Sequence, residues 1–183
     1  MSNREQNSNN ETIRAIMGRR SIRSFEPRSV EPEKVQILLE CAFAAPSAMN
    51  HQPCHIMCID SRELLDSISA VSERTRMAKS APLAFAVCVD VARYEKVHQL
   101  TDGTWMADSA CMMENILLAA RALGLEGVWL HIVSRPDREP GVLSLLNPPE
   151  GVKVFALALM GYGAETKAPH SGVSAARLHR NGW

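Results

Sequence analysis

The stretch TWMADSACMMENILLAARALG, from Thr104 to Gly124, decides the fold. It predicts the longest helix of the chain, and apolar residues occupy most of its sides, as is typical of a helix buried in the middle of a domain. Gly124 is expected to end this helix, because glycine favours the conformation that follows a helix C-terminus. The next stretch, LEGVWLHIV from Leu125 to Val133, predicts a strand.

The same reasoning predicts further elements on both sides of this pair. Continuous apolar runs predict strands at 54–60, 83–90 and 152–163. Apolar residues at helical spacing predict helices at 11–20, 32–46, 61–71 and 134–147. Ser29 and Ser61 are the expected caps of the second and third of these, and Pro140 and Gly141 weaken the last. The segments ERTRMAKSAP and VARYEKVHQLTDG are interpreted as irregular or polar connections.

Helices and strands alternate without a strict βαβ rhythm, since two helices precede the first strand. This order favours three layers, with a mixed sheet of four to five strands covered by helices on both faces. The 183 residues, 46% of them hydrophobic, suit a single domain, expected at 11–183 after a disordered arm at 1–10. The last segment, 164–183, has no apolar face of its own and is expected to pack on a partner subunit.

Composition excludes several classes of partner. Twenty basic and twenty acidic side chains cancel, so the overall charge attracts neither nucleic acid nor an anionic membrane surface. No apolar run approaches the roughly 20 residues that span a bilayer, and the polar start MSNREQNSNNET lacks a signal core. We therefore expect a cytoplasmic protein. Its five cysteines lack metal-ligand spacing and are expected to be reduced, buried thiols.

Motifs for several kinds of chemistry are missing. The chain contains neither GxGxxG nor GxxxxGK[ST], which disfavours a Rossmann or P-loop nucleotide site, and it contains no GxSxG elbow of a hydrolase. The six histidines lie on different predicted elements without thiol or carboxylate companions at ligand spacing. The pair His51 and His55 spans a loop and the start of a strand rather than one helical face. No metal site is predicted.

The cluster RRSIRSF, from Arg19 to Phe25, does indicate a site. Arg19, Arg20 and Arg23 carry planar guanidinium groups that suit phosphate, and Ser21 adds a hydroxyl of the kind that satisfies phosphate or ribityl oxygens. The alternative is a solvated basic helix end that complements the helix dipole and needs no ligand.

The loop APSAMNHQPCHI, from Ala45 to Ile56, is a second candidate. Its neutral hydrogen-bonding residues Ser47, Asn50 and Gln52 lie between Pro46 and Pro53, which restrict the backbone. Such a loop suits a polyol or a heterocycle, and the alternative is an ordinary turn between a helix and a strand.

Together these stretches resemble the FMN-dependent nitroreductase family. The resemblance covers nearly all of residues 12–183, in the expected order. It is carried by RRSIRSF, by APSAMNHQPCHI, by the long helix followed by ARALGLEGVWL, by the strand ending in MGYG, and by the terminal HRNGW. It implies an α+β fold in an intertwined homodimer, with two FMN molecules at the subunit interface.

The resemblance also implies roles for particular residues. Arg19, Arg20 and Ser21 would hold the FMN phosphate and ribityl chain, and Arg23 would lie near the N1/O2 edge of the flavin. The other subunit would place Pro46, Ser47, Ala48 and Asn50 along the ribityl chain and ring face. Arg76 would approach the pyrimidine edge, and the segment at His131 and Ile132 would face flavin N5, although HIVS departs from the small residues usual there.

The tail departs from the family pattern as well. Relatives carry a Lys/Arg cluster soon after the GY(P/G) strand end to complete the phosphate clamp. This chain offers Lys167, then His170 and Ser171, with Arg177 and Arg180 farther on, and the sequence does not assign the clamp.

By resemblance the chain is an FMN-dependent NAD(P)H oxidoreductase. Flavin N5 would take hydride from NADH or NADPH and pass it to a small nitroaromatic or quinone-type acceptor by a ping-pong scheme, without a catalytic side chain. Two alternatives stay open at this point. One is a flavin enzyme of the same fold with a dedicated metabolite substrate, and the other is a flavin-binding or redox-sensing protein without turnover.

Overall fold

A computed structural model describes residues 10–98, 103–168, 172 and 174–183. The expected disordered arm falls mostly at residues 1–9, which lie outside the described residues. The strands are β1 Cys54–Ile59, β2 Leu83–Asp90, β3 Glu126–His131 and β4 Val152–Gly161. The α-helices are α2 Glu11–Gly18, α3 Pro32–Phe43, α4 Arg62–Ser69, α5 Val91–His98, α6 Trp105–Ala122 and α7 Glu139–Leu146. Short 3₁₀ turns are η1 Ala48–Asn50, η2 Glu73–Lys79 and η3 Ala175–Arg177.

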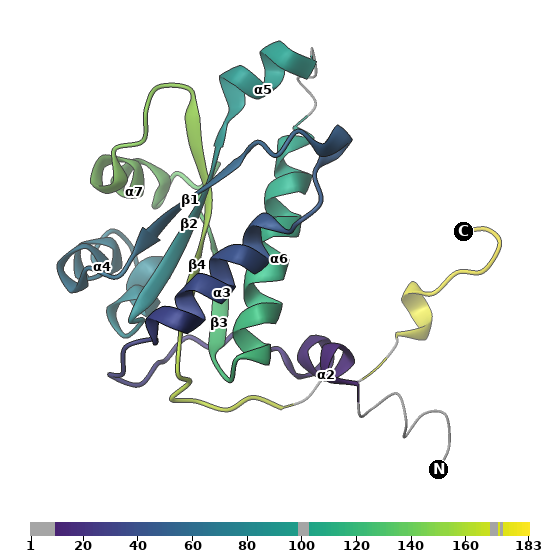
Figure 1. Ribbon diagram of the computed structural model, residues 1–183, viewed down its shortest axis with the longest axis horizontal. Coiled ribbons are helices and arrows are strands. Elements are labelled where there is room, and N and C mark those ends of the chain that lie inside the picture. The colour runs from purple at the N-terminus through teal and green to yellow at the C-terminus, as the bar shows by residue number, and fades with distance from the viewer. Residues whose placement is uncertain (1–9, 99–102, 169–171, 173) are drawn as a thin grey trace.

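The four strands form one sheet in the order β1-β2-β4-β3, so the predicted central strand at 83–90 is confirmed. Helices α3 and α6 cover one face of the sheet, and α4 and α7 lie on the other (Figure 1). The α+β three-layer fold is therefore confirmed. All three strand pairings are antiparallel, and in the described part of the chain the expected mixed direction is confined to an isolated parallel bridge between Ser21 and Gly127.

Alternating side chains of β2 divide the core into two halves. Phe85 and Val87 point toward α3 and α6, whereas Ala84 and Ala86 point toward α4 and α7. Because a strand turns successive side chains to opposite faces, a strand covered on both faces must be apolar throughout. The continuous run LAFAVCV meets that requirement, and all seven of its side chains are buried or nearly so.

Strand β4 carries one extra residue opposite β2. Val87 pairs with Ala156 and Cys88 with Val154, which leaves Phe155 as a bulge. The Phe155 carbonyl accepts hydrogen bonds from the backbone N–H groups of Ile132 (3.0 Å) and Val133 (3.2 Å). The bulge thus fixes the path of the chain just after β3.

Helix α6 is the predicted central helix. Eight of its eighteen residues are buried, among them Met113 and Ile116 at full burial. It packs against α3 and against the sheet, and its last turn leads through Gly124, at φ +74°, into β3. The positive φ explains why glycine follows this helix.

Several local predictions need correction. The N-cap of α3 is Glu31 and not Ser29, because Pro32 occupies the first helical position. Ser61 does cap α4, accepting the N–H of Leu64 at 3.3 Å. Pro140 lies in the first turn of α7, where its missing N–H costs nothing, so the helix starts at Glu139 rather than near 134.

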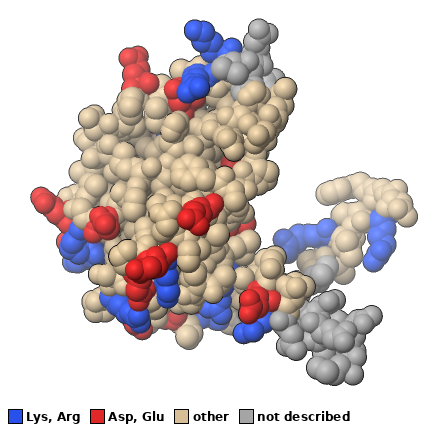
Figure 2. Space-filling model, in the orientation of Figure 1, with Lys and Arg blue, Asp and Glu red and all other residues tan. Residues whose placement is uncertain are grey.

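The two segments interpreted as connections contain helical structure. Residues 73–79 form the 3₁₀ helix η2, and residues 91–98 form α5. Of the helices in the described ranges, none is long and apolar enough to cross a bilayer. In Figure 2 acidic and basic side chains are interspersed along the lower part of the visible face, which agrees with the zero net charge.

Candidate flavin site

The arginine cluster follows α2 as an extended segment. Ser21 bridges to Gly127 of β3, and Phe25 bridges to Gly163 just after β4. The buried side chains of Ile22 and Phe25 anchor the segment on the sheet. Arg23 and Ser24, between these two anchors, are exposed.

Arg20 is held by three backbone carbonyls and keeps one open donor. Its Nε donates to the carbonyl of Ala168 (2.7 Å), and its Nη1 donates to the carbonyls of Met17 (2.9 Å) and Arg19 (2.6 Å). Its Nη2 is buried and has no hydrogen-bond partner among the described residues. Buried guanidinium N–H groups are normally paired, so this nitrogen suits an added anionic acceptor.

The segment after β4 supplies a further cation to this cluster. Lys167 donates from Nζ to the carbonyl of Ser21 at 2.5 Å. Beside it, the Glu165 carboxylate accepts the Arg23 N–H at 2.5 Å. The pKa of Glu165 is lowered, first by this backbone hydrogen bond and then by Lys167. Of the tail residues that the sequence left unassigned, Lys167 thus joins the cluster, whereas His170 and Ser171 lie outside the described residues.

Arg19 points elsewhere. Its Nε lies 3.4 Å from a carboxylate oxygen of Glu114 on α6. The structure therefore gathers Arg20, Ser21 and Lys167 closely, with Arg23 beside them, and directs Arg19 toward the helix layer.

The second predicted stretch forms a tight loop between α3 and β1. Three residues other than glycine have a positive φ there: Met49 (50°), Asn50 (58°) and Gln52 (49°). Such conformations cost on the order of 1–2 kcal/mol per residue and gather at functional sites. Gln52 donates its N–H to the Ser47 hydroxyl at 2.9 Å, which closes the loop.

Beside this loop lies a cavity of about 350 Å³. Its lining includes Phe43, Pro46, Ser47, His55, Asp108 and Met112. The predicted loop residues Pro46 and Ser47 thus border a space of the size that small-ligand sites have, on the order of 300–1,000 Å³.

Within one chain the two predicted half-sites lie at opposite ends of α6. Ala48 is bonded to Asp108 in the first turn of this helix, whereas Gly18, next to the arginine cluster, lies against the guanidinium of Arg121 in the last turn. At 1.5 Å per residue these two turns are about 20 Å apart. Figure 1 shows the loop before β1 at the upper end of α6 and α2 at the lower end.

The segment predicted to face flavin N5 ends strand β3. His131 is half-buried, and its ring meets the edge of Phe155 at a centroid distance of 5.1 Å. Burial lowers the pKa of His131, and the neighbouring Arg135 and Arg138 lower it further. The side chain of Ile132 is fully buried, and its backbone N–H is bonded to the Phe155 carbonyl, so this side chain does not reach a ligand.

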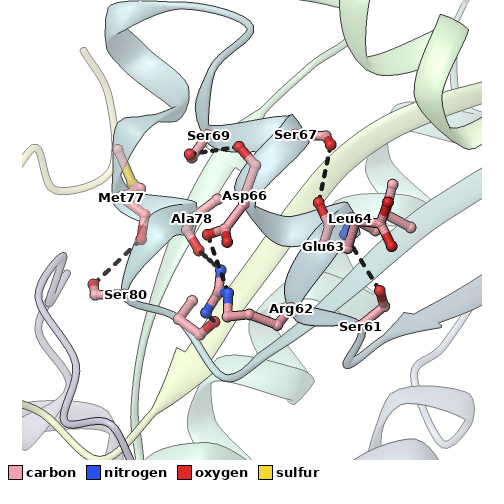
Figure 3. Close-up of polar contacts among 11 residues, drawn as sticks. Ser61, Arg62, Glu63, Leu64, Asp66, Ser67, Ser69, Met77, Ala78 and Ser80 are labelled. Carbon is pink, nitrogen blue, oxygen red and sulfur yellow. Dashed lines mark hydrogen bonds and ion pairs between the residues drawn. The ribbon is translucent and has the colours of Figure 1, made fainter.

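The structure does not bring Arg76 to the other predicted residues. Arg76 lies on η2, is exposed and forms an ion pair with Glu73. Figure 3 shows how η2 is fastened to α4: the Arg62 guanidinium donates to the carbonyl of Ala78 (2.9 Å) and pairs with Asp66. Arg76 is therefore on the α4 side of the sheet, away from α6.

Metal and thiol chemistry find little support here. Among the described residues no three His, Cys, Asp or Glu side chains gather as a metal site. All five cysteines are free thiols. Cys54 and Cys88 are buried as expected, and burial raises the pKa of each to about 11. The expectation of burial was wrong for Cys58 and Cys111, which are exposed.

Asp108 was not recognised from the sequence. It is a buried acid in the first turn of α6, and it holds the predicted loop through the N–H of Ala48. An acidic residue near a helix start is ordinary, so only the tertiary contact reveals it.

The fold agrees with comparisons to known proteins. The model of the nitroreductase family matches residues 16–99 and 72–162. A relative from Methanothermobacter thermautotrophicus, named "Putative NADH dehydrogenase/NAD(P)H nitroreductase", is 35% identical over 173 residues, 94% of this chain and 88% of its own. A protein of Bacillus subtilis strain 168 named an FMN reductase, with NAD(P)H added in the name, is 26% identical over 172 residues, 87% of this chain and 68% of its own.

A solved structure shows the same architecture. The crystal structure named "Putative NADH dehydrogenase/NAD(P)H nitroreductase" from Bacteroides thetaiotaomicron VPI-5482 superposes with a TM-score of 0.86 at 29% identity, over 95% of this chain and 99% of that one. The chain belongs to the nitroreductase family.

Proposed function

We propose that this chain is the subunit of a homodimeric, FMN-dependent NAD(P)H oxidoreductase that reduces nitroaromatic or quinone-type acceptors. The names of its relatives, an NAD(P)H nitroreductase and an FMN reductase, support the flavin and the nicotinamide donor. The structural observation that carries the proposal is the separation of the two half-sites by the length of α6.

In a homodimer, a half-site of one chain would meet the complementary half-site of the other. About 20 Å along α6 is too far for the two half-sites of one chain to close on one flavin, but two antiparallel copies bring the cluster of one against the loop of the other. Large apolar side chains are exposed on the helices that would meet. These are Ile13, Ile16 and Met17 on α2, Ile37 and Phe43 on α3, and Met106 on α6. Several large exposed apolar side chains on neighbouring helices favour a protein partner.

The residues present fit FMN. The open Nη2 of Arg20, the Ser21 hydroxyl and the Lys167 amino group supply donors for a phosphate. Arg23 supplies an exposed cation for the pyrimidine edge. The loop at 46–50 supplies neutral groups for the ribityl chain and the ring, the segment at His131 and Ile132 would lie beside flavin N5, and the tail at 164–183 would pack on the partner subunit.

Bound FMN supplies a ring that accepts hydride from NAD(P)H and returns it to an acceptor. The protein contributes position and charge. With FMN bound, Arg23 would stabilise negative charge at the N1/O2 edge, Arg20 and Lys167 would hold the phosphate, and the neutral loop would keep water from the ring face. No side chain of this chain is required as a nucleophile.

The direct test uses the purified full chain. We expect flavin absorption bands, about one FMN for each chain, and steady-state oxidation of NADH or NADPH with a quinone or a nitrofuran. A colourless monomer that takes up no added FMN contradicts the proposal. A yellow dimer whose flavin neither nicotinamide bleaches contradicts the reductase activity while leaving the flavin site in place.

A further inference from the structure

The carboxylate of Asp108 is buried and only half used. Its side chain lies in the first turn of α6 with 6% of the residue exposed. Its Oδ1 accepts the backbone N–H of Ala48 at 2.9 Å. Its Oδ2 is buried and has no hydrogen-bond partner among the described residues. Burying a carboxylate costs free energy unless hydrogen bonds compensate for the lost water. The hydrogen bond from the Ala48 N–H supplies part of that compensation for Asp108.

The recorded hydrogen bond of the Asp108 side chain lies outside its own helix. Thr104 is the N-cap of α6 and makes no side-chain cap bond, and the recorded bond of Asp108 crosses to a different segment 60 positions earlier. The N-terminus of α6 favours the negative charge, because the helix dipole places partial positive charge there. The dipole of α6 thus stabilises the Asp108 carboxylate, and this carboxylate accepts a hydrogen bond from the loop.

The loop that donates this hydrogen bond, residues 47–52, has a strained backbone. Met49 and Asn50, directly after Ala48, both have positive φ, as does Gln52. Packing does not hold Met49, whose side chain is 82% exposed. Strained residues persist only where the surroundings determine their conformation. The Ser47–Gln52 bond closes the loop on itself, whereas the Asp108 bond ties the loop to the helix layer.

We propose that Asp108 is a positioning residue of the flavin site: it holds the loop at 47–52 in its left-handed conformation so that Asn50 faces the coenzyme of the partner subunit. The last step of this inference, that Asn50 faces the coenzyme, rests on the proposed function. The tether itself, from Asp108 to Ala48, is a property of the chain alone.

The test compares three variants of the full-length dimer. Asp108→Ala removes the acceptor, Asp108→Asn keeps an oxygen for the Ala48 N–H, and Ser109→Ala alters the adjacent buried side chain. The Ser109 hydroxyl donates to Trp105 within α6 and contacts Cys54, so it does not touch the loop. It is the matched control.

The first measurement needs no coenzyme. Amide hydrogen exchange of the peptide covering 44–53 should be about 10-fold faster or more in Asp108→Ala, because the hydrogen bond that ties Ala48 to α6 is lost. Asp108→Asn should restore most of the protection, and Ser109→Ala should match the wild type. Unchanged exchange in a folded Asp108→Ala, or an equal loss in Ser109→Ala, overturns the tether.

The second measurement adds FMN. Asp108→Ala should bind FMN roughly 10-fold more weakly, with Asp108→Asn close to the wild type. Faster exchange with unchanged FMN affinity overturns the positioning role. If the wild type binds no FMN, the proposed function fails while the exchange experiment still decides the tether.

A loop-side variant covers the case in which Asp108→Ala does not fold. Ala48→Pro removes the N–H donor without altering α6. The preceding Ser47 has φ −136° and ψ 156°, a conformation that a following proline permits. Faster exchange across the rest of the loop is expected, and protection equal to the wild type contradicts the tether.

Discussion

The hydroxyl of Tyr162 donates a hydrogen bond to the Glu31 carboxylate at 2.6 Å, which joins the exit of β4 to the start of α3. Arg28 adds a hydrogen bond to Glu31 at 2.6 Å and lies 3.7 Å from the centre of the Tyr162 ring. These donors favour the charged carboxylate and lower the pKa of Glu31 to about 2, the Tyr162 hydroxyl being the largest cause.

This low pKa predicts a pH-dependent contribution to stability. A carboxyl group whose pKa is lower in the folded state stabilises the fold above its ordinary pKa of 4.5, and the contribution is lost as the pH falls toward 2. In Glu31→Gln that dependence should disappear, so the stability difference from the wild type should shrink between pH 5 and pH 2. Urea unfolding at several pH values measures it. Glu33→Gln in the same turn is the control, and a difference that stays constant with pH contradicts the prediction.

Arg23→Ala should weaken the coenzyme site without harming the fold. The Arg23 side chain is exposed, and its recorded hydrogen bond is one from Nη1 to the carbonyl of Ser21 at 3.1 Å. We expect FMN affinity to fall roughly 10-fold and the flavin midpoint potential to become more negative, because a cation near the reduced ring is lost. Fluorescence titration and redox titration measure these effects.

Two further variants sharpen the Arg23 experiment. Arg23→Lys keeps the charge and should retain most of the potential, and Arg74→Ala, an exposed arginine on η2, should change neither quantity. Unaltered affinity and potential in Arg23→Ala would remove this residue from the site.

The separated half-sites predict complementation between two defective chains. Arg20→Ala damages the cluster and Asn50→Ala damages the loop, so each homodimer carries two damaged sites. A mixed dimer carries one site with both lesions and one intact site. Random reassociation of equal amounts should restore about a quarter of the wild-type activity, since half of the dimers are mixed. Activity that stays at the level of the separate variants would show that both half-sites belong to one chain.

Gly161→Ala should destabilise the protein by overpacking. A Cβ at this position would lie 2.6 and 2.7 Å from the Cδ and Cγ atoms of Pro82, whose ring cannot move aside. We expect a loss of about 1–3 kcal/mol in the free energy of unfolding. Gly18→Ala is the control: its Cβ would meet the mobile end of Arg121 at 3.1 Å and should cost under about 1 kcal/mol. Equal unfolding midpoints for the two variants would contradict this account.

The secondary structure could be predicted where it depends on local patterns. The run at 83–90 is apolar on both faces because both faces are covered, and the Ser61 cap acts three residues away. Helix α5 was missed because half of VARYEKVH is charged or histidine, which hides the buried pair Val91 and Tyr94. Ser29 failed as a cap because Pro32 already sets where α3 begins.

The candidate site could be predicted only in part, because its long-range contacts leave no local signal. RRSIRSF and the proline-bracketed loop are visible as clusters of polar residues. The approach of Lys167 to Ser21 spans 146 positions, and the bond from Asp108 to Ala48 spans 60. Both use a backbone group as one partner, and any residue can supply that group. The sequence therefore cannot show which residue will.

The bulge at Phe155 has a consequence for how this protein can diverge. The carbonyl of Phe155 in β4 fixes the backbone of both Ile132 and Val133. The path of the chain past the proposed ring position therefore depends on β4 and not on the side chains of that segment. The exposed residues 135–137 are thus open to replacement without rebuilding the sheet. Substitutions in this stretch would change the substrate preference from one relative to another while the fold stays the same.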